Sequence, residues 1–290
     1  MPDFQKQTVQ WFPGHMAKTR RKIKESLPLV DAVVEIVDAR IPESSRNPEL
    51  DEITAGKPRI ILLNKSDIAD PRATDAWMDH YRKQGCFVLA VDCKSGRGLS
   101  HFEGVCRTAL KERIEQNERK GMSGRPLRLM VVGIPNTGKS SFINRMSNSA
   151  RLKVENRAGV TRSNQWVVCG NGLELLDTPG VLWPKFEDPS VGDKLAFIGS
   201  VKDDVMDVET IAVRLLDVLK TDYTDLLCAR YKVDPSVAEL ESYEVLEAIG
   251  RKRGMLLRGN EVDTERAANT LLNEYRAGKL GKITLERPKG

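Results

Sequence analysis

The sequence contains no apolar run that approaches the length of a membrane-spanning helix. The stretch Ala32–Val37 is only as long as a strand, and Glu35 interrupts it. Met1–Gln10 lacks the apolar core of a signal peptide. We therefore expect a cytoplasmic protein that has no membrane as its partner.

Cysteine and histidine are both scarce. The 290 residues include five cysteines, which form no Cys-x-x-Cys pair, so the sequence indicates reduced thiols and neither a disulfide framework nor a zinc site. The three histidines are His15, His80 and His101. We interpret His80 and His101 as structural or solvated side chains.

No strong excess of charge of one sign is present, because the net charge is only +5. That value alone does not argue for a nucleic-acid partner. The basic residues are nevertheless grouped at Lys18–Lys24, Arg251–Arg258 and Lys279–Lys289. Each group can be a solvated helix face, but several groups in one chain favour a phosphate-rich partner.

Apolar runs alternate with helical patterns over the first two thirds of the chain. Strands are expected at Val30–Asp38, Arg59–Asn64, Cys86–Val91 and Leu127–Val132. Helices are expected at residues 15–28, 71–83 and 99–119. This alternation is typical of an α/β domain, in which helices cover both faces of a mostly parallel sheet.

Two further strands are expected close together. Gln165–Cys169 and Leu173–Leu176 flank Gly170–Gly172, which favours a hairpin turn. From about residue 195 the pattern has helical spacing and no strand signal. We expect an α/β domain over residues 1–190 and a small all-α domain over residues 195–290.

A glycine-rich loop directly follows the strand expected at Leu127–Val132. Gly133–Ser140 has the pattern Gly-x-x-x-x-Gly-Lys-Ser and leads into a helix. The backbone N–H groups of such a loop converge on phosphates, and the helix N-terminus adds a positive dipole. Lys139 should then reach the β- and γ-phosphates, and the Ser140 hydroxyl should bind Mg²⁺. The loop residues expected to contact the nucleotide are Asn136, Thr137, Gly138, Lys139, Ser140 and Ser141.

The tetrapeptide Asn64–Asp67 follows another buried strand and can distinguish guanine from adenine. The Asp67 carboxylate can accept hydrogen bonds from N1–H and the 2-amino group, which adenine does not offer. Asn64 can meet the other edge of the base, and the stem of Lys65 can cover its face. The same residues can also form an exposed turn, but their place at the end of a strand favours a ligand site. The second base-contacting loop is expected at Asp92, Cys93 and Lys94.

The residues Asp177–Gly180 read Asp-Thr-Pro-Gly and end the last expected strand. Asp177 should hold Mg²⁺ through water, and the Gly180 N–H should face the γ-phosphate. Thr161 is the candidate switch residue, whose hydroxyl would complete the Mg²⁺ shell only when a γ-phosphate is present. An ordinary loop threonine is the alternative. GTP or GDP with Mg²⁺ is thus the expected ligand.

The order of these motifs is unusual. In a Ras-like domain the phosphate loop comes first and the base-reading motif comes last, whereas here Asn64–Asp67 precedes Gly133–Ser140. We therefore predict a circularly permuted P-loop GTPase domain. In such an arrangement the segment that senses the γ-phosphate leads directly into the helical domain.

Taken together, the motifs resemble those of the YlqF/YawG group of circularly permuted GTPases. Trp11–Met16 is similar to the N-terminal signature of that group, and Asp38–Pro42 followed by Ser44–Pro48 is similar to its early motif. Ala158 departs from the proline that the group usually has before Gly-x-Thr. The resemblance implies a cytoplasmic GTPase that acts late in assembly of the large ribosomal subunit, is stimulated by it, and touches ribosomal RNA and proteins. Neither a membrane nor DNA is among the implied partners.

Ras-like enzymes have a glutamine after Asp-x-x-Gly that orients the attacking water, but this chain has Val181 and then Leu182. Slow intrinsic hydrolysis is therefore expected. Asn136 is one candidate replacement, because the resemblance implies that it helps to hold K⁺ beside the phosphates. The alternative is that Asn136 only stabilises the turn of the loop.

His15 is the second candidate, because an imidazole titrates near neutrality and can position or activate water. The alternative is that His15 stacks on RNA bases together with Trp11 and Phe12. Two functions thus remain: a switch enzyme that hydrolyses GTP on a pre-ribosome, and an RNA-binding chaperone that GTP regulates and whose hydrolysis is incidental. An ATP-using enzyme is opposed by Asp67.

Overall fold

The computed structural model describes residues 13–147, 165–180, 188–201 and 207–288, leaving aside the side chains of residues 13–19. Two compact units are present, and each is described by itself. One comprises the described residues from 13 to 180 together with Glu286–Pro288. The other comprises the described residues from 188 to 285.

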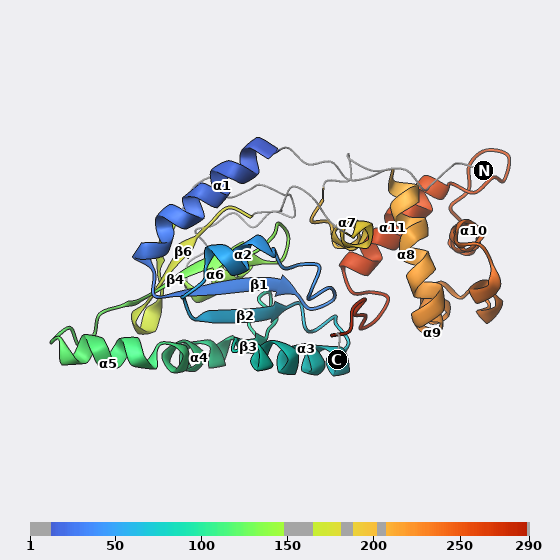
Figure 1. The fold of residues 1–290 in the computed structure, drawn as a ribbon. Helices are drawn as coiled ribbons and strands as arrows, with labels where there is room; N and C mark the ends of the chain where they lie inside the picture. Colours follow the sequence, from blue (N-terminus) through green and yellow to red (C-terminus); the bar gives the residue numbers. More distant parts are fainter. Residues whose placement is uncertain (1–12, 148–164, 181–187, 202–206, 289–290) are drawn as a thin grey trace. The chain divides into compact units, whose positions relative to one another are not determined.

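In the first unit the described residues form a six-stranded sheet in the order β3-β2-β1-β4-β6-β5 (Figure 1). Its strands are β1 (Ala32–Asp38), β2 (Arg59–Asn64), β3 (Phe87–Ala90), β4 (Leu127–Val132), β5 (Gln165–Val168) and β6 (Leu173–Asp177). All neighbouring strands are parallel except β5 and β6, which are antiparallel and flank the expected turn at Gly170–Gly172. The predicted fold class, with a mostly parallel sheet, is confirmed.

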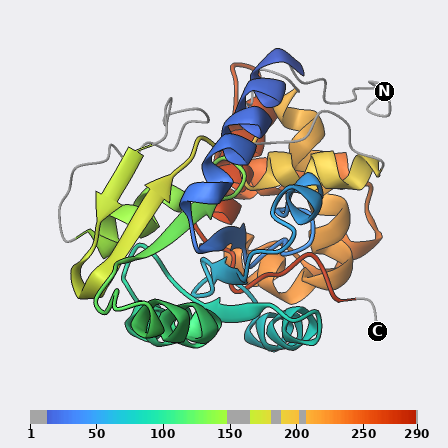
Figure 2. The ribbon, with the colours of Figure 1, turned by 60° about the vertical axis from the view of Figure 1, so that its left-hand side comes forward.

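Helices cover both faces of this sheet. They are α1 (Pro13–Ser26), α2 (Glu49–Ile53), α3 (Pro71–Lys83), α4 (Phe102–Ala109), α5 (Lys111–Arg119) and α6 (Lys139–Met146). Figure 2 shows α1 lying across one face, where its Ile23 belongs to the same buried cluster as Val33. On the other face Phe102 and Phe142 join the cluster of Val34. Every residue of β1 is buried, which explains its nearly unbroken apolar sequence.

The single helix expected over residues 99–119 is wrong. The structure has a short 3-10 turn at Leu99–His101, then α4, and then α5 as a separate helix. Leu110 lies between α4 and α5 with φ −111° and ψ 18°, outside the helical region. Its side chain is buried in the core together with Cys106. The helix is therefore interrupted where an apolar side chain packs into the core.

The second unit is helical. It contains α7 (Pro189–Phe197), α8 (Val208–Asp222), α9 (Thr224–Tyr231), α10 (Ser242–Lys252) and α11 (Thr264–Arg276). α8 packs against the other four helices, with Ile211, Leu215 and Leu219 completely buried along one side of it. Across the ranges that are described, no helix of either unit is both long and apolar enough to cross a bilayer.

The chain returns to the first unit at its C-terminal end. The carboxylate of Glu286 accepts hydrogen bonds from the backbone N–H of Glu43, at 2.8 Å, and of Ser44, and also from the Ser44 hydroxyl. The Glu286 carbonyl accepts one from Trp77 Nε1 at 3.2 Å. Arg287 forms an ion pair with Asp70, the N-cap of α3. Residues 286–287 thus brace the loop that follows β1 against α3; we call this pair the C-terminal brace.

Candidate nucleotide-binding site

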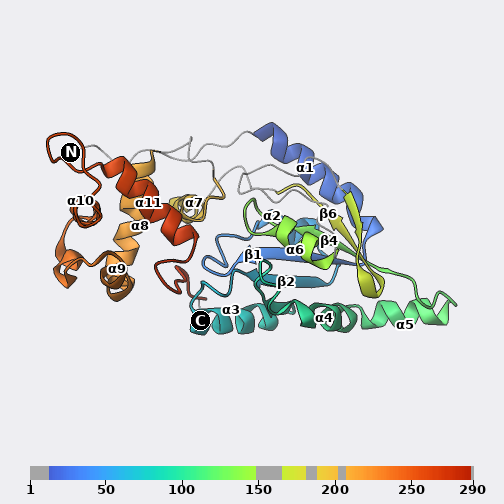
Figure 3. The same cartoon turned by 180° about the vertical axis from the view of Figure 1, so that it is seen from behind.

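The glycine-rich loop has the strand–loop–helix context that its motif requires. β4 ends at Val132, and α6 begins at Lys139 beside β4 and β6 (Figure 3). Gly133, Asn136 and Gly138 have φ of 147°, 62° and 102°, so the backbone turns sharply between them. The first N–H groups of α6 therefore lie at the end of the loop, where an anion binds.

The loop also packs closely against the neighbouring strands, and this restricts two of its positions to glycine. A Cβ on Gly133 would stand 2.5 Å from the backbone oxygen of Ile36. A Cβ on Gly138 would collide with Nδ2 of Asn64. Both contacts bring parts of the chain that are far apart in sequence to the carboxyl ends of β1, β2 and β4.

Asn64 joins the base-reading motif to two other loops. Its Nδ2 donates a hydrogen bond to the Thr137 carbonyl at 2.6 Å, and its Oδ1 accepts one from the Cys93 N–H at 2.9 Å. The side chain is buried, so both bonds form away from water. The structure thus brings together three of the predicted motifs, Asn64–Asp67, Gly133–Ser140 and Asp92–Lys94.

Lys65 makes a second link to the phosphate loop. Its Nζ donates to the Asn136 carbonyl at 2.9 Å and lies 2.9 Å from Oδ2 of Asp38. Burial alone would raise the pKa of Asp38, but Arg40 and Lys65 outweigh it and hold that pKa well below its usual range. Asp38 and Arg40 therefore adjoin the site, although the sequence indicated them only as part of a family motif.

Lys139 lies at the start of α6 and is nearly buried. Its Nζ donates to the carbonyls of Gly133 and Ile134, both at 3.0 Å. Burial lowers the pKa of Lys139 to about 8, and the charge of Asp177 opposes that shift. A Cβ on Gly180 would stand 2.9 Å from Nζ of Lys139. The predicted phosphate-binding lysine and the Asp177–Gly180 motif are therefore neighbours.

The threonines of these motifs stabilise their backbone: one closes the phosphate loop on itself, and the other ties its motif to β4. Thr137 Oγ1 donates to the Ile134 carbonyl at 3.0 Å, and Thr178 Oγ1 donates to the Val131 carbonyl at 2.7 Å. Ser140 and Ser141 occupy the first turn of α6 and are partly exposed. Asp177 ends β6 directly beside Val131 of β4. A hydroxyl at the start of α6 and a carboxylate at the end of β6 thus both belong to elements that adjoin the phosphate loop.

Of three further predicted site residues, only Asp67 has a described side chain. Asp67 is half-buried, and its negative charge favours the charged form of Lys65. Thr161 lies outside the described residues. His15 lies in α1, and its side chain is also outside the description.

The loop Asp92–Lys94 is held by its own hydrogen bonds. The Lys94 N–H donates to the Asp92 carboxylate at 2.9 Å, and the Lys94 carbonyl accepts from Arg145 of α6 at 2.6 Å. Cys93 is only 2% exposed, and its side chain lies in the core cluster. The contribution of Cys93 to this loop is therefore its backbone N–H rather than its thiol.

We expect the Cys93 thiol to resist alkylation in the folded protein. Burial raises its pKa to about 12, so at pH 8 its thiolate fraction is about a thousandfold below that of a thiol with the ordinary value of 9.0. Iodoacetamide labelling at pH 8 followed by peptide mass spectrometry measures this, with the same reaction in urea as the control. Equal labelling rates in the two conditions would show that the thiol is accessible.

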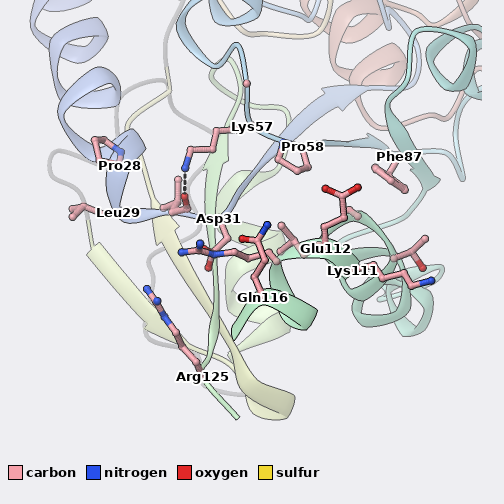
Figure 4. Close-up of a pocket in the computed structure, with 16 residues that line it drawn as sticks. Pro28, Leu29, Asp31, Lys57, Pro58, Phe87, Lys111, Glu112, Gln116 and Arg125 are labelled. Carbon is pink, nitrogen blue, oxygen red and sulfur yellow. Dashed lines mark hydrogen bonds and ion pairs between the residues drawn. The ribbon is translucent and has the colours of Figure 1, made fainter. Parts of the chain in front are cut away.

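A pocket of about 550 Å³ lies at the opposite edge of the sheet (Figure 4). Pro28–Asp31, Gly56–Pro58 and Phe87 line it and precede or begin β1, β2 and β3. The Lys57 ammonium donates to the Val30 carbonyl at 2.7 Å, and Asp31 is paired with Arg113. This pocket is thus separate from the nucleotide motifs, which lie where the parallel strands end.

The comparisons with known proteins agree with this geometry. A family model described as "50S ribosome-binding GTPase" matches residues 128–248. Ribosome biogenesis GTPase A of Priestia megaterium is 47% identical over 282 residues, which cover 97% of this chain and 97% of that protein. The protein of that name from Thermotoga maritima is 32% identical over 281 residues, covering 97% and 95%. This chain belongs to the ribosome biogenesis GTPase A family.

Two solved structures are similar to this ribosome biogenesis GTPase. The GDP-bound structure of TM YlqF has a TM-score of 0.64 at 30% identity and covers 93% of this chain and 100% of that one. GNP-bound YlqF from T. maritima has a TM-score of 0.62 at 29% identity, covering 94% and 99%. The predicted membership in the YlqF/YawG group is confirmed. The chain is a GTPase that binds guanine nucleotides through a circularly permuted domain.

Proposed function

We propose that this GTPase acts in the cytoplasm on the large ribosomal subunit during its assembly, and that the ribosomal particle stimulates its GTP hydrolysis. The observation that carries the proposal is the pair of hydrogen bonds from Asn64 and Lys65 to the phosphate loop. They join a guanine-reading motif and a phosphate-binding motif in one site. The names of the relatives and of the matching family model support the ribosomal partner.

In this proposal each motif holds one part of the nucleotide. Asp67 accepts hydrogen bonds from the guanine base, while Asn64 and the stem of Lys65 border it. Asp92–Lys94 flanks the base from the next strand. The residues from Asn136 to Ser141 surround the phosphates, and Lys139 pairs with the β- and γ-phosphates.

The residues present fit a Mg²⁺ ion that is held largely by the nucleotide. Asp177 is completely buried at the end of β6, and Ser140 lies in the first turn of α6, directly after the loop. The described residues contain no cluster of three or more histidine, cysteine or acidic side chains that could form a cage of their own. Mg²⁺ typically takes one or two protein oxygens and completes its shell with phosphates and water. We propose Ser140, Asp177 and, with GTP, Thr161 as the protein ligands.

Two residues are proposed to replace the missing glutamine. Asn136 lies in the loop at φ 62°, and its carbonyl accepts a hydrogen bond from Lys65. We propose that it helps to hold K⁺ beside the phosphates, where a cation stabilises developing negative charge. His15 remains a prediction, as either a water-positioning residue or an RNA-stacking residue.

The test is the rate of GTP hydrolysis with and without purified large subunits, in KCl and in NaCl at equal ionic strength. We expect the subunits to raise the rate by roughly tenfold or more, and K⁺ to support a higher rate than Na⁺. Small subunits serve as the control particle. A rate that large subunits leave unchanged would contradict the proposal and favour the GTP-regulated RNA chaperone.

A further inference from the structure

Asp38 is a completely buried carboxylate that two cations share. Its Oδ1 accepts from the N–H and Nε of Arg40, at 3.1 and 2.9 Å. Its Oδ2 accepts from Nη2 of Arg40 at 2.8 Å and lies 2.9 Å from Nζ of Lys65. Asp38 ends β1 directly beside Asn64 of β2, which is the first residue of the base-reading motif.

Arg40 is also buried. Its bidentate contact balances the negative charge of Asp38 and fixes the orientation of the carboxylate. The same carboxylate then presents Oδ2 to Lys65. Two positive charges thus meet one negative charge, and the arrangement holds only while Asp38 is ionised between them. Without that negative charge, Arg40 and Lys65 would repel each other in a site with little water.

Such a restraint matters for Lys65 because its backbone conformation is uncommon. Its φ of 61° lies in the left-handed region, which costs energy for a residue with a side chain. Its Nζ contacts the Asp38 carboxylate and also donates to the Asn136 carbonyl. One ammonium group therefore connects the end of β1 with the phosphate loop.

We propose that Asp38 is a positioning residue for guanine recognition, which fixes Lys65 so that Asp67 and the phosphate loop are aligned before the nucleotide arrives. Asp38 itself does not touch the nucleotide. This inference rests on the proposed roles of Lys65 and Asp67. A loop that is already held in its bound geometry binds more tightly, because it loses less conformational entropy when the ligand binds.

The test compares Asp38→Asn with Glu35→Gln. Glu35 is another fully buried carboxylate of β1, but it pairs with Arg46 and Arg59 rather than with Lys65. The probes are GDP and IDP, which differ only in the 2-amino group that Asp67 is proposed to bind. Calorimetry should show that Asp38→Asn weakens GDP binding by about tenfold and narrows the ratio of GDP to IDP affinity. Glu35→Gln should leave that ratio unchanged.

A purely structural role gives different results. If Asp38 only stabilises the fold, GDP and IDP binding should weaken by equal factors, and this outcome would overturn the inference. In a Lys65→Met background, Asp38→Asn should no longer change the ratio, because its effect passes through Lys65. Additive effects of the two substitutions would also overturn it.

Separate controls distinguish a loss of folding from a failure of the proposed guanine site. Asp38→Asn combined with Arg40→Gln removes both charges of the buried pair and should restore folding if the single variant is unstable. That double variant must still show the narrowed ratio, and Lys65→Met alone must show it too; an unchanged ratio in either refutes the inference. Wild-type protein that binds GDP and IDP equally would instead contradict the proposed guanine site itself.

Discussion

Replacement of Lys139 by alanine should weaken the binding of GTP and GDP by roughly 30- to 5,000-fold, since truncating one partner of a desolvated charge pair costs about 2–5 kcal/mol. Lys139 is buried at the start of α6, and its ammonium donates hydrogen bonds to the carbonyls of Gly133 and Ile134. These carbonyls can hydrogen-bond to water when the ammonium is gone. We therefore expect a folded protein that has lost its phosphate contact.

The measurement is a titration with a fluorescent GDP analogue, alongside a thermal melt that reports folding. Lys220→Ala is the matched control, because Lys220 also donates to a backbone carbonyl, that of Leu240, but belongs to α8 of the helical unit. The control should bind like wild type. Tight GTP binding by a folded Lys139→Ala protein would remove Lys139 from the phosphate site.

The second large effect is a change of base specificity. Asp67→Asn should weaken GTP binding by about 10- to 150-fold, because an amide cannot accept from both N1–H and the 2-amino group and leaves one donor unsatisfied. The same amide can donate to the 2-oxo group of xanthine. We therefore expect the variant to prefer XTP to GTP.

Competition of XTP and GTP for the labelled nucleotide measures this preference. Asp79→Asn is the control, since Asp79 lies on the exposed side of α3 and pairs only at the surface with Arg82. It should leave both affinities unchanged. If Asp67→Asn binds GTP as wild type does, another residue must read the base.

Much of the site could be predicted because its chemistry is local in sequence. The four strands before the phosphate loop are short apolar runs, and the carboxyl ends of parallel strands meet at one edge of a sheet. The positions of Asn64–Asp67 and Gly133–Ser140 follow from this rule without knowledge of contacts.

The parts that could not be predicted depend on contacts between distant residues. The ion pairs of Asp38 with Arg40 and Lys65 could not be predicted from the sequence, although a charged residue at the end of the largely apolar run in β1 indicated that another group must balance its charge. The interruption of the helix at Leu110 depends on the packing of that side chain into the core. Glu286 lies 242 residues beyond Ser44, and no local pattern connects them.

The C-terminal brace affects the order in which the parts of the first unit can form. Glu286 and Arg287 follow the whole helical unit in sequence, yet they hold the loop that follows β1, only a few residues beyond Asp38. During synthesis these two residues are made only after every helix from α7 to α11 has been made. The loop behind the base-reading motif can therefore reach its final form only after the helical unit has been synthesised, so completion of the first unit depends on residues that lie beyond the second.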